Sequence, residues 1–280
     1  MRLFLLTTLT MLAFAANSVL NRMAIRVEGA DALAFAALRL VAGAGVLLIL
    51  RRGRLTEAGA LLSRRRLSGA ACLLLYMLGF SLAYRALDAG AGALILFGGV
   101  QLTMFAGAAL AREALTARRI LGAAIAFAGL VWLVAPGHGA QIDPLAAGLM
   151  ALAALGWGGY SLIGRGETAP LAATAASFVL ACVPAVALAV AQAQAMLSGR
   201  AAVLALASGA VTSGLGYALW YRILPVLGAS RAAVAQLTVP VIALALGVAL
   251  LGERPDMTAL LATLLVLGGV ALSLLQGRQT

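Results

Sequence analysis

The stretch SRAAVAQLTVPVIALALGVALLGE, residues 230–253, decides the fold class of this chain. It is long and apolar enough to cross a bilayer as a helix, which takes roughly 20 apolar residues. Pro240 leaves the carbonyl of Gln236 without its helical donor, so we expect a kink near the middle of the membrane. Irregular backbone is stable at that depth only where it is buried in protein or faces a wet cavity. The stretch therefore predicts a membrane protein with an interior cavity.

A second version of this stretch lies 140 residues upstream, at residues 90–113. It reads GAGALILFGGVQLTMFAGAALARE and places Glu113 over Glu253, with Val100 in the place of Pro240. Polar residues elsewhere match in the same order, namely Ser18 and Arg22 with Ser161 and Arg165, and Tyr84-Arg85 with Tyr221-Arg222. We interpret the chain as one unit written twice, with residues 1–137 as the first copy and residues 144–280 as the second.

The composition is that of an integral membrane protein. Hydrophobic residues make up 64% of the chain, charged residues only 10%, and the mean hydropathy is +1.06. A soluble core cannot use that much apolar sequence. The 280 residues have room for about ten spans of roughly 20 residues each. The spans that we predict are 3–25, 31–50, 68–85, 89–111, 119–136, 145–164, 171–192, 201–222, 228–251 and 256–275.

The arginines, which are the only basic residues besides one histidine, indicate the orientation. With both termini in the cytoplasm, fourteen arginines fall on the inner side, five on the outer side, and Arg39 within a span. Basic residues collect on the cytoplasmic side of membrane proteins, so both termini are predicted to lie inside. The connection at 51–67 holds six of the fourteen and is the longest loop.

Each predicted copy has five spans, which is an odd number, so the second copy must enter the membrane upside down. Inverted repeats of this kind place a binding site near the midplane, between the halves, and open it to either side in turn. We therefore expect an all-α membrane protein of ten helices, arranged as two inverted five-helix repeats around a central cavity.

Several motifs carry a resemblance to a known family. They are Asn17-Ser18-x-x-x-Arg22 in the first span, AALRL with Arg39 in the second, YRAL at 84–87, and S-R-A-A…P-V…L-L-G-E in the ninth. In this order the chain resembles the EamA branch of the drug/metabolite transporter superfamily, and within it the amino-acid exporters of the YddG type. The first copy departs from the pattern, with Gly90-Ala91-Gly92-Ala93 in the place of S-R-A-A.

The resemblance implies a multi-pass protein of the bacterial inner membrane that works as a single chain and exports amino acids from the cytoplasm. It does not fix the substrate, because the family also covers drug-like compounds and other small metabolites. That second substrate class stays open as the alternative.

Polar and aromatic residues within spans are costly against lipid and should face the interior. Spacings of three and four residues place them on shared helix faces. The candidate substrate-binding residues are Asn17, Asn21, Arg39, Tyr76, Phe80, Phe97, Gln101, Trp157, Tyr160, Ser161, Tyr217 and Gln236. The candidate hinge residues are Gly98, Gly99 and Pro240. Thr212 and Ser213 either face the cavity as well or bond back to their own helix.

Arg39 has two interpretations. An arginine near the middle of a helix costs roughly 2.5–3.5 kcal/mol on insertion scales, so it must meet backbone carbonyls, reach outward, or face a cavity. It is either a structural anchor or the group that holds a substrate carboxylate.

No Asp or Glu falls well inside a predicted span, whereas ion-coupled pumps usually keep a carboxylate there. We expect facilitated transport, or weak coupling through Glu113 or Glu253. A neutral amino acid, aliphatic or aromatic, fits the polar and aromatic residues that we expect in the cavity. Its carboxylate would meet Asn17 or Arg39, and its ammonium Gln101, the Gln236 carbonyl or an aromatic face.

Other function classes are disfavoured. The chain has one histidine, His138, and two cysteines without a CxxC pair, so we expect no metal and no cofactor. An enzyme would need a nucleophile beside a base, which the sequence does not offer. The arginines cluster at span ends rather than on a basic face with aromatics, so a nucleic-acid partner is not expected. The expected partners are the lipid bilayer and a small-molecule substrate.

Overall fold

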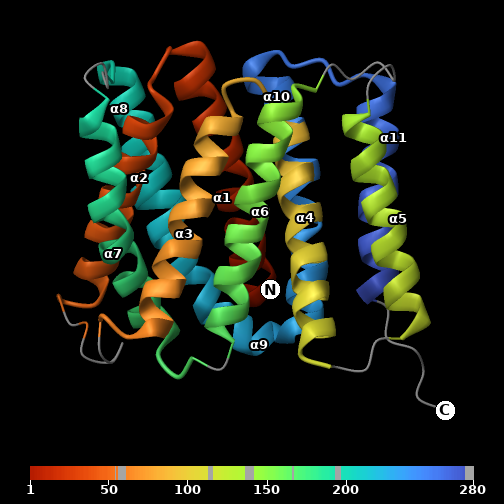
Figure 1. Ribbon diagram of the computed structural model, residues 1–280, viewed down its shortest axis with the longest axis horizontal. Coiled ribbons are helices and arrows are strands. Elements are labelled where there is room, and N and C mark those ends of the chain that lie inside the picture. The colour runs from red at the N-terminus through yellow and green to blue at the C-terminus, as the bar shows by residue number, and fades with distance from the viewer. Residues whose placement is uncertain are drawn as a thin grey trace.

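The computed structural model describes residues 1–53, 55, 61–112, 116–135, 142–165, 167–192 and 197–274, with backbone only at 228–234 and 274. Within these residues every regular element is a helix, and most of the helices stand side by side in one bundle (Figure 1). The chain is therefore all-helical, as its hydropathy predicts.

The helices follow one another in two series. The first consists of α1 (Arg2–Arg22), η1 (Met23–Val27), α2 (Ala32–Leu50), α3 (Arg64–Ala83), α4 (Ala89–Leu110) and α5 (Ala117–Val134). The second consists of α6 (Pro144–Gly164), α7 (Pro170–Ala191), α8 (Gly199–Leu206), η3 (Ala207–Leu215), α9 (Gly216–Gln236), α10 (Thr238–Leu251) and α11 (Met257–Leu274). The elements η1 and η3 are π-helices that continue α1 and α8 without a break.

Eight helical stretches among the described residues are long and apolar enough to cross a membrane, and two shorter apolar helices, Thr238–Leu251 and Met257–Ser273, accompany them. Large apolar side chains point away from the bundle, among them Phe4, Ile49, Leu110, Val190 and Leu264. An apolar outer surface of this extent is unfavourable in water and favourable in lipid.

Helix starts follow ordinary capping chemistry. Asp31 accepts hydrogen bonds from the amides of Leu33 and Ala34 at the start of α2, and Ser63 caps α3 through the amide of Arg66. Thr116, Asp143 and Ser198 do the same for α5, α6 and α8. Each such cap stabilises its helix by about 1 kcal/mol and fixes where the span begins.

Glycines bring α3 and α6 unusually close together. A β-carbon on Gly156 would lie 2.6 Å from the amide nitrogen of Tyr76, and one on Gly79 would lie 2.7 Å from the carbonyl oxygen of Leu149. Backbone contact of this kind is how helices pack in membranes, where no hydrophobic force drives them together. The close approach places Tyr76 of α3 beside Trp157 of α6.

Helix packing is paired between the two series. The packing of α3 on α6 has its counterpart in the packing of η3 and α9 on α1. In the same way, the packing of α4 on α6 has its counterpart in that of α10 on α1. Helix α2 packs on η3 as α3 packs on α7, and three further interfaces, α2 with α7, α4 with α10 and α5 with α11, join corresponding members of the series. Helix α1 begins and α11 ends toward the same, lower side of the bundle (Figure 1).

The boundary that we predicted between the spans 201–222 and 228–251 is wrong. The connection lies within α9, which runs through Pro225 to Gln236, and the helix breaks at Leu237 instead. The kink expected from Pro240 is present as this break, where the Thr238 hydroxyl donates to the carbonyl of Ala235 at 2.7 Å. Helix α10 has 14 residues, about 21 Å, so it is shorter than the roughly 30 Å of a hydrocarbon core.

Candidate functional site

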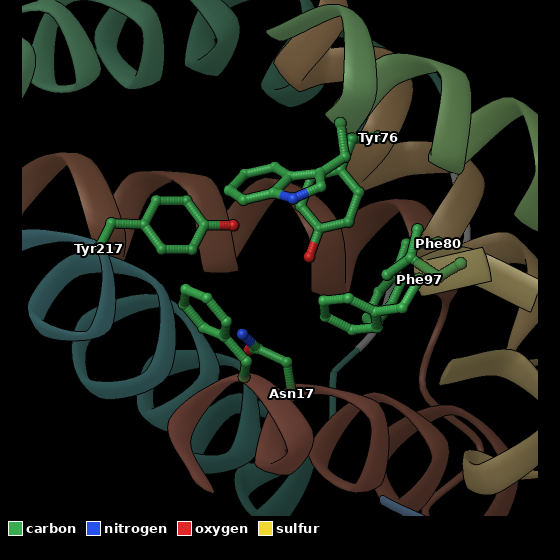
Figure 2. A pocket seen from close by; sticks show the side chains of 8 residues that line it. Asn17, Tyr76, Phe80, Phe97 and Tyr217 are labelled. Carbon is green, nitrogen blue, oxygen red and sulfur yellow. The ribbon is translucent and has the colours of Figure 1, made fainter. Parts of the chain in front are cut away.

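A small cavity lies at the centre of the bundle. Its lining comes from five helices and consists of Phe14 and Asn17 of α1, Tyr76 and Phe80 of α3, Leu96 and Phe97 of α4, Trp157 of α6, and Tyr217 of α9 (Figure 2). The volume open to the centre of a water-sized sphere is about 10 Å³, which is room for about one water. The site is therefore closed in this structure.

The cavity lies deep between the ends of the bundle. Along α3, Tyr76 follows Arg66 of the first turn by about 15 Å and precedes Tyr84 at the other end by about 12 Å, at 1.5 Å per residue. A group in the cavity is thus roughly equally far from both ends.

Aromatic rings form most of the wall. The ring centroids of Tyr76 and Trp157 are 5.1 Å apart, those of Trp157 and Tyr217 are 5.0 Å apart, and those of Tyr76 and Phe80 are 5.4 Å apart. Phe14 contacts Tyr217 edge-on at 5.8 Å. Contacts at these distances hold the rings in fixed orientations and add to the burial of their area.

Asn17 supplies an amide to this wall, and its orientation is fixed from behind. Its Oδ1 accepts hydrogen bonds from the hydroxyls of Ser208, at 2.8 Å, and Thr212, both on the π-helix η3. The nitrogen of the Asn17 amide points toward the cavity (Figure 2). π-Helical turns recur at functional sites, and here the turn places the two hydroxyls four residues apart on the Asn17 oxygen.

Arg39 lies one layer behind the wall and is 0% exposed. Its Nε donates to Ser213 Oγ and its Nη2 to Tyr76 Oη, both at 3.1 Å. The guanidinium carbon stands 5.5 Å from the centre of the Tyr76 ring and 5.1 Å from that of Phe80. Among the described residues Arg39 makes no ion pair, and its Nη1 has no hydrogen-bond partner.

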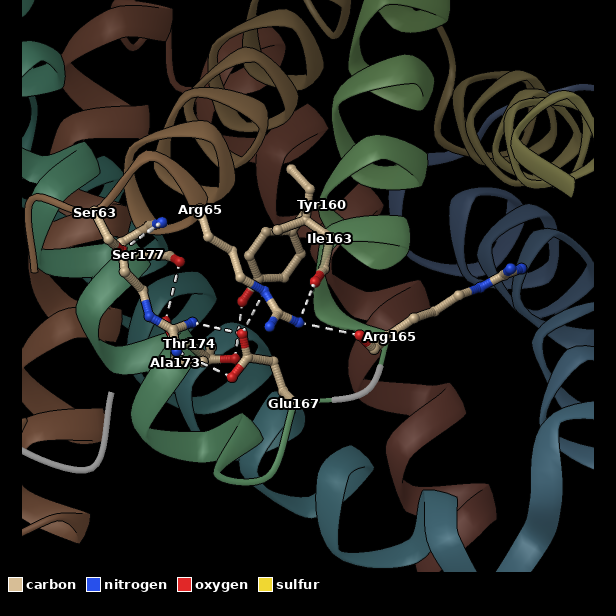
Figure 3. A network of polar contacts seen from close by, with 10 residues as sticks. Ser63, Arg65, Tyr160, Ile163, Arg165, Glu167, Ala173, Thr174 and Ser177 are labelled. Carbon is tan, nitrogen blue, oxygen red and sulfur yellow. Dashed lines mark hydrogen bonds and ion pairs between the residues drawn. The ribbon is translucent and has the colours of Figure 1, made fainter. Parts of the chain in front are cut away.

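An ion-pair cluster lies at the end of the bundle where α3 begins and α6 ends (Figure 3). We call it the Glu167 cluster; it consists of Arg65, Arg66 and Glu167. Both oxygens of Glu167 accept from Arg66, at 2.9 and 3.0 Å, and Arg65 pairs with the same carboxylate at 2.9 Å. Arg65 also donates to the carbonyls of Ile163 and Arg165, each at 3.0 Å, and so ties α3 to the end of α6.

A second cavity, with about 20 Å³ of water-sized room, lies beside this cluster. Tyr160 and Thr174 contribute to its wall and share a hydrogen bond of 2.8 Å. The space is bounded in part by the arginines and carboxylate of the cluster itself, so it belongs to this end of the bundle.

The Glu253 cluster lies at the opposite end, where α1 ends and α4 begins, and consists of Arg22, Asp88, Glu253 and the amide of Ala89. Arg22 pairs with Asp88 at 2.7 Å and approaches Glu253 to 3.6 Å. The Glu253 oxygens accept from the amide of Ala89, the first residue of α4, at 2.8 and 3.0 Å. Burial raises the pKa of Glu253 and Asp88 adds to the rise, whereas the amide bonds and Arg22 oppose it.

The structure brings together six of the predicted site residues: Asn17, Tyr76, Phe80, Phe97, Trp157 and Tyr217 all line the central cavity. Arg39 stands directly behind two of them. Sequence reasoning missed Phe14 and Leu96. Phe14 could have been found, because it lies three residues before Asn17 and shares its helix face; Leu96 has no distinguishing signal.

Five predicted residues lie elsewhere. Asn21 donates to the Asn17 carbonyl at 2.9 Å and accepts from the Ser81 hydroxyl at 2.8 Å, so it joins α1 to α3. Ser161 bonds back to the carbonyl of Trp157 at 2.7 Å. Tyr160 lines the second cavity, and Gln101 and Gln236 are part-buried outside the central lining.

The predicted hinge glycines are packing positions in this structure. Helix α4 runs without interruption through Gly98 and Gly99. A β-carbon on Gly98 would lie 2.9 Å from Val266 of α11, and one on Gly99 would lie 2.7 Å from Ala154 of α6. Pro240 is buried three residues after the break at Leu237.

Glu113 and His138, which the sequence singled out, lie outside the described residues. Within the part of the chain that is described, no group of three His, Cys, Asp or Glu side chains could hold a metal ion.

Comparison with known proteins identifies the family. Helices of spanning length around a buried polar centre define a multi-pass membrane protein. Residues 144–275 match the model of the EamA-like transporter family. An uncharacterized protein of Pseudomonas aeruginosa is 47% identical over 278 residues, which cover 98% of this chain and 94% of the relative. The chain belongs to the EamA-like transporter family, within the drug/metabolite transporter superfamily.

A solved crystal structure, described only as that of a protein, has the same fold. It superposes with a TM-score of 0.71 at 19% identity and covers 100% of this chain and 99% of its own. At this identity the likeness concerns the fold alone.

Proposed function

We propose that this transporter exports small neutral amino acids, aliphatic or aromatic, from the cytoplasm by alternating access through the central cavity. The observation that carries this is the position of the cavity, midway along α3 between two ion-pair clusters that close opposite ends of the bundle. An alternating-access carrier needs a central site and two closures that open one at a time.

The present state corresponds to the occluded or resting stage of such a cycle. Room for about one water cannot hold an amino acid, so the helices must separate before a substrate binds. Opening at the lower end would break the bonds from Arg65 and Arg66 to Glu167 and to the end of α6. Opening at the other end would break those of Arg22 and Glu253. Each closure joins different helices, so one can open while the other holds.

Two inverted five-helix copies, ten spans in all, account for the way the helices pack. Exchanging the two series maps the contacts of α3 with α6 onto those of α9 and η3 with α1, as a pseudo-two-fold axis requires. Both termini are then cytoplasmic, in the bacterial inner membrane, and a single chain holds the whole site.

Weak coupling to ions, or none, fits the lining. Among the described residues that form the cavity wall, none is an Asp or a Glu. The carboxylates that could respond to protons lie in the end clusters, with Glu253 the one whose pKa is raised by burial. The alternative substrate class, lipophilic drug-like compounds, would use the aromatic wall but leave Arg39 unused.

Counterflow in proteoliposomes with a panel of radiolabelled amino acids tests this function. We expect saturable uptake that internal unlabelled substrate accelerates, which a channel does not show. The variant Trp157→Ala removes a ring of the wall and should lower uptake at least roughly 10-fold, the size of effect seen when a buried aromatic contact is lost.

Trp220→Ala is the matched control. Trp220 is as buried as Trp157, at 7% against 9% exposed, and its ring contacts that of Phe14 at 5.7 Å, yet Trp220 does not line the cavity. Equal uptake by the two variants, or no uptake of any amino acid by the wild type, would contradict the proposed function.

A further inference from the structure

The cavity wall presents hydrogen-bond donors, and two of its acceptors, the side-chain oxygens of Asn17 and Tyr76, already receive hydrogen bonds from behind. The Tyr76 oxygen accepts from Arg39, which leaves the hydrogen of its hydroxyl for another partner. The Asn17 oxygen accepts from both Ser208 and Thr212, which leaves the two hydrogens of its amide nitrogen. Figure 2 shows that nitrogen and the Tyr217 hydroxyl directed into the cavity. A group that binds here must supply acceptors.

A buried positive charge stands behind these donors. Arg39 is 0% exposed, and its polar partners are two neutral hydroxyls. The rings of Tyr76 and Phe80 offset part of the cost through cation–π contact. Its Nη1 still lacks a partner, and buried cations are otherwise paired with anions. None of the described residues supplies the negative charge that would balance Arg39, so a bound anion would fill this need.

An ammonium group finds less in the same place. Among the described residues of the wall there is no carboxylate, and Gln101 and Gln236, which we expected to receive an ammonium, lie outside the lining. A cation would find only ring faces and neutral hydroxyl oxygens such as that of Tyr217, and Arg39 already stands over the rings of Tyr76 and Phe80.

Building on the transport function proposed above, we propose that the cavity is a carboxylate site in which the ammonium group of an amino acid is dispensable. The carboxylate oxygens accept from Asn17 and from Tyr76, whose hydroxyl is polarised by Arg39, and the negative charge balances the guanidinium. The substrate class is therefore apolar monocarboxylates, with an aromatic or branched body against the rings, and neutral amino acids are one subset of it.

A competition series separates the two ends of the ligand. Proteoliposomes take up radiolabelled phenylalanine in the presence of 3-phenylpropionate, which lacks the ammonium group, or phenethylamine, which lacks the carboxylate. We expect 3-phenylpropionate to inhibit within about 3-fold of unlabelled phenylalanine, and phenethylamine to be about 10- to 100-fold weaker, as for the loss of a charge-assisted hydrogen bond. Phenethylamine as potent as phenylalanine, or no inhibition by 3-phenylpropionate, would overturn the proposal.

A binding measurement on the purified protein tests the carboxylate site without requiring transport. In detergent, 3-phenylpropionate should raise the thermal midpoint of the purified protein and phenethylamine should not. That result without any phenylalanine uptake would refute amino-acid export and leave the carboxylate site supported. If phenylalanine is taken up but only phenethylamine stabilises the protein, the carboxylate site is refuted and amino-acid export remains supported.

Variants of Arg39 test whether its positive charge acts on the carboxylate of the ligand. Arg39→Gln should weaken 3-phenylpropionate about 10- to 100-fold and leave phenethylamine unchanged, and Arg39→Lys should restore part of the loss. Arg85→Gln removes a half-exposed arginine at a helix end and is the control, with no change expected. Should Arg39→Gln fail to fold, Tyr76→Phe decides, with an expected loss of roughly 2- to 10-fold for the carboxylate only. Equal losses for both ligands would overturn the assignment.

Discussion

Arg39 and Arg66 are both buried, at 0% and 9% exposed, yet they are bound in opposite ways. Arg66 forms a two-pronged pair with Glu167, and each of its hydrogen bonds to that carboxylate is 3.0 Å or shorter. Arg39 contacts two hydroxyls and two rings and leaves Nη1 without a partner. Burying a cation costs several kcal/mol unless an anion is near. The difference is what our proposals require, with Arg66 held in a closing ion pair and Arg39 left to balance the charge of a bound carboxylate.

Their positions fit these two roles. Arg66 lies in the first turn of α3, where Glu167 can reach it from the connection after α6. Arg39 lies eight residues into α2, too far from either end for its side chain to reach the membrane surface.

The largest expected effect is on stability at the Glu167 cluster. Glu167→Gln leaves two arginines around a neutral amide, and breaking a buried pair in this way costs about 3–5 kcal/mol. We expect a marked fall in the thermal midpoint of the purified protein in detergent. The double variant Arg66→Gln/Glu167→Gln should lose less than the sum of the single losses, and fully additive losses would show that the pair is not coupled.

Arg39→Met should behave in the opposite way. Methionine replaces the aliphatic part of the arginine side chain with an unbranched apolar one and removes a cation that has no anion, so the free energy of unfolding should stay unchanged or rise by about 1 kcal/mol. The thermal midpoints of Arg39→Met and Arg66→Gln, each compared with the wild type, measure this difference. A loss as large as that of Arg66→Gln would mean that Arg39 is a structural anchor, the other interpretation that the sequence allows.

Glu253 is the intermediate case, with one arginine near it and Asp88 beside it, and we expect the smallest effect there. Burial raises the pKa of Glu253 above its ordinary 4.5, so the folded protein holds this proton more tightly than the unfolded chain. The stability from this group is full below pH 4.5 and is lost as the pH rises through the raised pKa.

The thermal midpoint should therefore decline slightly as the pH rises across this window, and Glu253→Gln should flatten the decline. Glu28→Gln changes another carboxylate at a helix end and should leave the slope as it is. A thermal midpoint of the wild type that rises with pH over the same window would contradict a raised pKa of Glu253 in the folded protein.

Much of the cavity follows from the cost of polar and aromatic side chains in lipid. That rule places Asn17, Tyr76, Trp157 and Tyr217 in the interior, and the structure has each of them in the cavity wall. The same rule cannot tell the cavity from other interior sites. It therefore also selected Asn21, which joins two helices, and Ser161, which bonds to its own backbone.

Other features depend on geometry that spacing along a helix does not contain. The π-helix η3 shifts the register of Ser208 and Thr212, so hydropathy gives no reason to connect them with Asn17. The segment around Pro225 and Gly228 is helical, whereas Pro and Gly in sequence favour a loop, so local signals alone put the boundary in the wrong place. Arg39 left two interpretations open because its partners lie on α3 and η3, far away in the chain.

The volume of the central cavity has a consequence for the cell. A cavity with room for about one water, with an ion-pair cluster toward each end of the bundle, leaves little space for a file of water through the centre of the described helices. If the protein cycles as we propose, its resting state conducts no ions, and a membrane that holds many copies keeps its voltage. Leakage would begin only if both closures opened together, which is the failure that their placement on different helices guards against.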